Sequence, residues 1–237
     1  MIASAIKRRL HRDICSDPVL HGLVLNLYLN GEEFPHRTDD YFPVWAVRDK
    51  DLLSTMQSHM RDEDKHVAIY RKAISKIGQP IVALPIAEIY NSIICRYTPH
   101  SFHISQEDSA DQRVFKLANF MAHLHFLEKR IARSLEFHLE GCSSSPSDYS
   151  EKAVKIVLGD ETHHVEYTRE AVFHLLPEPS AKTVLDEHRR AEARANLDFS
   201  SQQLTMLTSQ YADRFPRARR RIYRHASDLL EWGLKYA

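Results

Sequence analysis

One segment restricts the fold of this chain more than any other, because residues 49–77 contain neither glycine nor proline and repeat their apolar side chains with a helical period. Spacings of four and three alternate along one face, which is the pattern of a long α-helix with a single inward stripe. A helix stop, Gly-Gln-Pro, follows at residues 78–80. The inward stripe comprises Leu52, Met56, His59, Glu63, His66, Tyr70, Ala73 and Ile77. The segment is therefore predicted to be a packed helix that turns charged and polar side chains toward the core.

The same combination recurs later in the chain. Residues 62–66 read DEDKH and residues 160–164 read DETHH, so the pattern Asp-Glu-x-x-His occurs twice. A random chain of this composition would contain roughly 0.07 copies. The spacing i, i+3 places the Glu and the His on one helical face, so both can bind one ion. The second copy also lies in an apolar stripe, formed by Val154, Val157, Glu161, His164, Thr168, Ala171 and Leu175.

A third stripe contains a single carboxylate. Ser109 and Gln112 form a capping-box pattern that opens a helix running to Gly141. Its inward positions are Val114, Leu117, Met121, Leu124, Glu128, Ile131 and Leu135. A buried carboxylate is costly unless it is paired, protonated or bound to a cation. Three Glu and two His in one core would repel each other, and a pair of metal ions resolves that conflict.

The donor atoms indicate which metals fit. Carboxylate oxygen and imidazole nitrogen suit iron or manganese better than metals that prefer thiolates, and the pairs Fe/Fe, Mn/Fe and Mn/Mn all use these donors. Asp62 and Asp160 stand immediately before the two motif Glu residues, just beside the stripes. From there each is expected to accept the outer ring N–H of the His on the opposite helix, which fixes the ring orientation.

At these positions the sequence resembles the ferritin-like di-iron carboxylate superfamily of the oxidase and oxygenase type. That superfamily takes a Glu from one helix, Glu-x-x-His from the next, a Glu from the third and Glu-x-x-His from the fourth. The last three elements are matched here by Glu63 with His66, by Glu128, and by Glu161 with His164. The resemblance covers roughly residues 17–176.

The remaining carboxylate of the superfamily pattern is expected at a similar distance before Glu63, where Glu32 and Glu33 both stand. Glu32 is favoured because Leu25, Tyr28 and Glu32 continue an inward stripe. Glu33 stays open as the alternative.

The resemblance implies an all-α fold, with a ferritin-like four-helix bundle and a long crossover between its second and third helices, at residues 79–108. It implies an enzyme that binds two Fe ions, activates O2 and oxidises or oxygenates a small organic substrate, with a ferredoxin or a reductase as electron donor. The alternative is a ferritin-like protein that handles iron or removes peroxide. A metal-free helical interaction module is the third possibility, but it gives the buried carboxylates no physical explanation.

Composition fits this interpretation. With only 6 Gly and 43% hydrophobic residues, residues 1–237 are expected to form one helical domain, a core bundle at about 17–176 and a helical extension at about 180–237. The extension could cover the bundle, shape a substrate pocket or form a homodimer contact. The formal net charge of zero gives no case for nucleic acid or a membrane surface. The N-terminal residues lack a long apolar stretch followed by a small-residue cleavage site, and the chain contains no run of 18 apolar residues, so a cytoplasmic protein is expected.

Two smaller features have plain interpretations. The arginine-rich segment at 214–224 could bind phosphate, an acidic protein or RNA, but a solvated helix face is favoured. Cys15, Cys95 and Cys142 are odd in number and lack Cys-x-x-Cys spacing, which favours free thiols without a role of their own in a reducing compartment.

Overall fold

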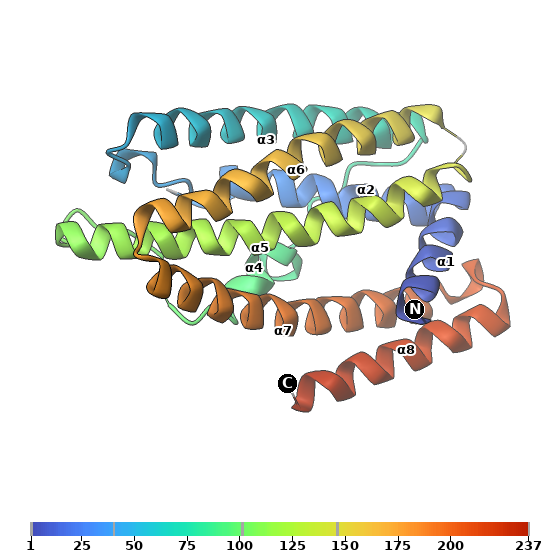
Figure 1. Cartoon of the computed structure of the whole chain (residues 1–237). Helices are drawn as coiled ribbons and strands as arrows, with labels where there is room; N and C mark the ends of the chain where they lie inside the picture. The colour runs from blue at the N-terminus through green and yellow to red at the C-terminus, as the bar shows by residue number, and fades with distance from the viewer. Residues whose placement is uncertain (1, 40, 101, 146, 237) are drawn as a thin grey trace.

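The computed structural model describes residues 2–39, 41–100, 102–145 and 147–236, and every regular element within those ranges is helical (Figure 1). The long helices are α1 (Ile2–Ser16), α2 (Pro18–Glu32), α3 (Lys50–Lys76), α5 (Ala110–Cys142), α6 (Asp148–Leu175), α7 (Glu178–Gln210) and α8 (Arg217–Tyr236). The shorter elements are α4 (Tyr90–Cys95) and the 3-10 turns Phe34–Arg37, Val44–Ala46, Ile86–Glu88 and Ala212–Arg214. The predicted all-α fold is confirmed. None of the described helices is long and apolar enough to cross a membrane.

Local sequence signals set the helix ends. Asp17 caps α2, since its Oδ1 accepts the backbone N–H of Val19 at 2.8 Å. Asp49 caps α3, and Gly78 follows that helix with φ of 69°, a left-handed conformation that favours glycine. Ser109 begins α5 with the complete capping box that the sequence predicts.

Four long helices, α2, α3, α5 and α6, lie side by side and enclose the main core (Figure 1). Helix α5 packs along α6, α6 packs on α3, and α3 packs on α2. Helices α3 and α5 run in the same direction, so the chain between them has to return along the molecule (Figure 1). That connection contains α4, which packs against α7.

The remaining helices cover one side and one end of this core. Helix α1 crosses the end of the molecule and packs on α5, whereas α7 lies along α5 and carries α8 on its other side (Figure 1). Helix α1 was not predicted from the sequence, although Ile6, Leu10 and Ile14 repeat every four residues along one face and pack in one apolar cluster. Helix α8 begins at Arg217, so most of the arginine-rich segment is helical.

One residue of the predicted inward stripe of α5 is not buried, so the prediction is wrong at that position. Val114 is 39% exposed, whereas Leu117, Met121, Leu124 and Leu135 are buried as expected. The first turns of α5 extend past the neighbouring end of α6 (Figure 1). A stripe can continue in sequence beyond the point where a partner helix ends, and periodicity does not indicate where that happens.

Candidate metal centre

The six residues proposed as metal ligands lie together inside α2, α3, α5 and α6. Their exposed fractions are 7% or less. Helix α2 supplies its last residue, α3 and α6 each supply a Glu and a His one turn apart, and α5 supplies one Glu from the middle of its length. The residues are Glu32, Glu63, His66, Glu128, Glu161 and His164.

The ligand atoms fall into two adjoining groups that share one residue. Atoms of Glu32, Glu63, His66 and Glu161 lie within 4.8 Å of one another, and so do atoms of Glu128, Glu161 and His164. Because Glu161 belongs to both groups and has two oxygens, it can contact a cation in each. The arrangement suits two neighbouring metal ions of the type that prefers oxygen and imidazole donors.

Two buried atoms of this cluster have no hydrogen-bond partner. They are His66 Nδ1 and Glu161 Oε1, which lie 3.6 Å apart. Glu32 Oε2 is 3.4 Å from the same His66 nitrogen. Buried polar atoms almost always have partners, so these two need one. A cation between them would satisfy both.

Burial and neighbouring negative charge disfavour the ionised form of two of the four carboxylates. Burial, and then the neighbouring Glu63 charge, raise the pKa of Glu32 to about 8. Burial and the other carboxylates raise the pKa of Glu161 well above its ordinary value. Burial also lowers the pKa of His164 to about 4, which keeps its imidazole neutral and able to bind a metal. Among the ion pairs of the described residues, none joins a Lys or Arg to the four clustered Glu residues.

The two aspartates lie beside the motif histidines, as their positions in the sequence predict. Asp160 Oδ2 is 3.0 Å from His66 Nε2, and Asp62 Oδ2 is 3.4 Å from His164 Nε2. Each aspartate thus contacts the histidine of the other motif and leaves the Nδ1 atom of that ring facing the carboxylates. Lys65 Nζ contacts Asp160 Oδ2 at 2.5 Å, which holds this carboxylate from the solvent side.

A third histidine, His59, also belongs to the centre. Its Nε2 lies 3.0 Å from Glu63 Oε1 and 3.6 Å from Glu128 Oε1. Its ring stacks on His164 with centroids 3.6 Å apart, and its Nδ1 lies 2.7 Å from the Tyr167 hydroxyl. In the sequence, His59 lies on the inward stripe of this helix, but no role is predicted for it. Its position one turn before Glu63 on that stripe was the feature of the sequence that could have indicated its place in the cluster.

The alternative to Glu32 lies elsewhere. Glu33 forms an ion pair with Arg71 outside the cluster. Glu32, by contrast, is buried and contacts His66. The geometry therefore favours Glu32 as the carboxylate contributed by α2.

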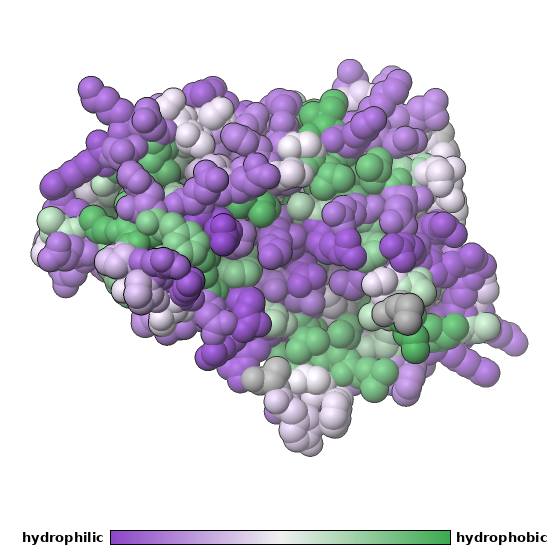
Figure 2. All heavy atoms as spheres, viewed as in Figure 1, coloured by the Kyte–Doolittle hydropathy of each residue, from purple (hydrophilic) through white to green (hydrophobic). Residues whose placement is uncertain are grey.

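A cavity of about 580 Å³ connects the carboxylates with the surface. Glu32, Glu63 and Glu128 line one part of it, and the exposed side chains Ile2 and Leu229 line another. Most of the remaining wall is apolar and comes from α1, α2, α5, α7 and α8. Figure 2 shows apolar surface gathered beside α7 and α8 on this side of the molecule. The volume lies in the range typical of small-molecule pockets.

Comparisons of the chain with protein-family models, with curated proteins and with solved structures found no match.

Proposed function

We propose that the protein is a di-iron carboxylate enzyme with a ferritin-like four-helix bundle, which uses O2 to oxidise an apolar organic substrate. The main observation behind this proposal is the cavity, because its apolar wall extends to three buried carboxylates. The residues that would hold the two ions are Glu32, Glu63, His66, Glu128, Glu161 and His164.

The charges of the cluster support two divalent ions. Four ionised Glu carry four negative charges, and two Fe(II) ions carry four positive charges. Neutral imidazoles from His66 and His164 complete a donor set that suits iron or manganese. The unpartnered atoms His66 Nδ1 and Glu161 Oε1 face the space where such an ion would lie.

Bound ferrous ions would supply the electrons and the coordination positions that O2 activation requires. The protein contributes positioning and exclusion of water. His59 holds Glu63 and is itself held by Tyr167, while the apolar cavity wall keeps bulk water from the reacting part of the substrate. Repeated turnover would need an external electron donor, such as a ferredoxin or a reductase.

The cavity supports an organic substrate over iron handling as the function. Hydrated iron ions need a polar path to reach a buried centre, because their transfer through apolar surroundings is very costly. The cavity that meets the carboxylates is lined mostly by aliphatic and aromatic side chains. An apolar compound that leaves its reactive carbon beside Glu32, Glu63 and Glu128 fits this wall.

The first experiment measures iron and manganese in full-length protein produced with both metals supplied, for the wild type and for Glu128→Ala. We expect about two ions per wild-type chain and at most about half of that in the variant, because Glu128 belongs to one of the two ligand groups. Glu136→Ala is the matched control, since Glu136 lies in the same helix and is exposed.

Uptake of O2 by the Fe(II) form, with and without a panel of apolar compounds, then tests the reaction. Stimulation by a compound of the panel supports the enzyme. Uptake that depends only on added iron or peroxide would favour an iron-handling protein instead. A wild-type chain that retains no metal would overturn the di-iron proposal.

A further inference from the structure

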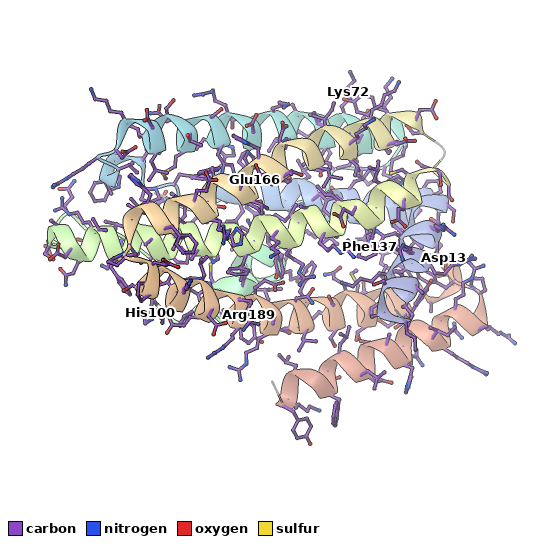
Figure 3. The ribbon with its side chains drawn as sticks, viewed as in Figure 1. Asp13, Lys72, His100, Phe137, Glu166 and Arg189 are labelled. Carbon is purple, nitrogen blue, oxygen red and sulfur yellow. The ribbon has the colours of Figure 1, made fainter. Side chains whose placement is uncertain are left out.

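A second buried group of metal-binding side chains lies outside the carboxylate cluster, where α1, α2 and α5 meet. Cys15 comes from α1, His21 from α2, and His138 and Cys142 from α5. One ligand atom of each lies within 4.8 Å of the others, and all four residues are 4% exposed or less. Figure 3 labels Phe137 in α5, directly before His138, at the end of the molecule where α1 crosses α5.

Both imidazoles turn the same nitrogen toward the group. His21 Nε2 and His138 Nε2 are 3.1 Å apart, and Cys15 Sγ lies 3.7 Å from His138 Nε2. Their outer Nδ1 atoms meet hydroxyl groups, Ser145 Oγ at 3.3 Å from His21 and Tyr28 Oη at 3.3 Å from His138. With Nδ1–H donating to these hydroxyls, both Nε2 lone pairs face the cysteines, as in metal sites whose histidines are oriented from outside.

Two of the distances between ligand atoms fit a tetrahedral ion. Metal bonds of about 2.0–2.1 Å to nitrogen and about 2.3 Å to sulfur place the ligand atoms of a tetrahedral zinc site about 3.3–3.8 Å apart. The contacts of 3.1 and 3.7 Å lie close to this range. We propose that Cys15, His21, His138 and Cys142 bind one Zn²⁺ ion in a closed Cys2His2 site.

Other occupants fit less well. A two-iron, two-sulfur cluster with this ligand set would hold the cysteines on one iron and the histidines on the other. In such a cluster the cysteine sulfurs and the histidine nitrogens would bind different iron ions and lie apart. In this structure, however, Cys15 Sγ is 3.7 Å from His138 Nε2. A Cys15–Cys142 disulfide would leave the two facing Nε2 atoms without a shared partner. Four protein ligands fill the coordination of zinc, so the site is structural rather than catalytic.

Helix α1 approaches α5 closely at this group of four residues, and a glycine makes that approach possible. A Cβ atom at Gly141 would lie 2.8 Å from the His11 carbonyl oxygen and 3.1 Å from Cys15 Sγ. Glycine inside a helix costs stability relative to alanine, so its presence here needs a reason. It lets Cys15 reach Cys142, and the ion then ties the N-terminal helix to the core.

Two of the three cysteines for which the sequence indicated no role are thus grouped with histidines. The two ligand pairs are separated by 117 positions, counted from His21 to His138, and neither resembles the Cys-x-x-Cys spacing of common zinc sites. The spacing of His138 and Cys142, four residues apart on one helix face, was the only local signal.

The test is zinc content of full-length protein produced with zinc and iron supplied, for the wild type, Cys142→Ser and Cys95→Ser. We expect about one zinc per chain in the wild type and a loss of about tenfold or more in Cys142→Ser. The matched control Cys95→Ser keeps its zinc, because Cys95 lies outside the group beside His123. Iron is measured in the same samples, so that loss of zinc from this site can be distinguished from loss of iron from the carboxylate cluster.

Cobalt substitution gives a second readout that does not require the variant to fold. Co²⁺ bound by thiolates shows a sulfur-to-metal charge-transfer band, which the carboxylate cluster lacks the sulfur ligands to produce. We expect this band in the wild type, in Cys95→Ser and in Glu128→Ala. Wild-type protein that binds no zinc and gives no such band overturns the proposal, as does a chain mass two hydrogens lower that maps to a Cys15–Cys142 disulfide.

Discussion

Each motif histidine in the carboxylate cluster contacts an aspartate of the other motif. Asp160 contacts His66 and Asp62 contacts His164, at the ring nitrogen that faces away from the carboxylates. The side chains of Asp62 and Asp160 are 29% and 26% exposed, so neither is part of the packed core. Replacing either aspartate should therefore alter metal binding more than it alters folding.

Replacing Asp160 by Asn tests this. We expect metal affinity to fall about 10-fold to 100-fold, because the amide is a weaker acceptor for the ring N–H and no longer fixes its orientation. Competition against a chelator of known affinity measures the change. Asp64→Asn is the control, since Asp64 is exposed on α3 and contacts His36 rather than the cluster. Equal affinities for the two variants would contradict the orienting role.

The helices that contain the cluster could be predicted from the sequence because they are long and pack against other helices on one face. The stripes of α3 and α6 identified Glu63, His66, Glu161 and His164 as buried. The sequence did not indicate how α1 meets α5, because that contact depends on the missing side chain of Gly141. An apolar stripe is visible in a sequence, whereas a close approach between two backbones is not.

Helix α8 shows how tertiary contacts alter the interpretation of a charged segment. The sequence favoured a solvated face for residues 214–224. In the structure Arg219 Nη1 lies 2.5 Å from Asp13 Oδ1 and Tyr223 donates its hydroxyl to Asp13 Oδ2 at 2.8 Å. Arg214 contacts Asp17 at 3.2 Å. Part of the segment therefore fastens α8 to the N-terminal helices.

Replacing Asp13 by Asn should weaken this attachment. Asp13 is buried, and losing its charge weakens two hydrogen bonds, so we expect the free energy of unfolding to fall by about 1–3 kcal/mol. Urea unfolding followed by circular dichroism measures the difference. Arg221→Ala changes an exposed residue of α8 and should stay within about 0.5 kcal/mol of the wild type. A similar loss in both variants would mean that Asp13 does not anchor α8.

At the scale of the whole molecule, the sequence indicated the candidate metal ligands but not the space around them. The ligands follow from motifs within single helices. The cavity needs α1 and α8 from opposite ends of the chain, together with α2, α5 and α7. The Cys15 and Cys142 group likewise depends on how helices distant in sequence meet. Helix rotations and crossings decide both, and a periodic pattern does not specify them.

The cavity leads to a prediction about substrate size. Leu27 lines it from α2 without belonging to the carboxylate cluster, so Leu27→Trp should shorten the available space and leave the ligands in place. We expect unchanged metal content and an O2 uptake that falls about tenfold for the longest accepted compounds of a homologous apolar series, while shorter members keep most of their effect. Ile222→Trp adds the same side chain at an exposed position outside the cavity and should change neither. If long and short compounds lost activity equally in Leu27→Trp, the cavity would not be where the substrate binds.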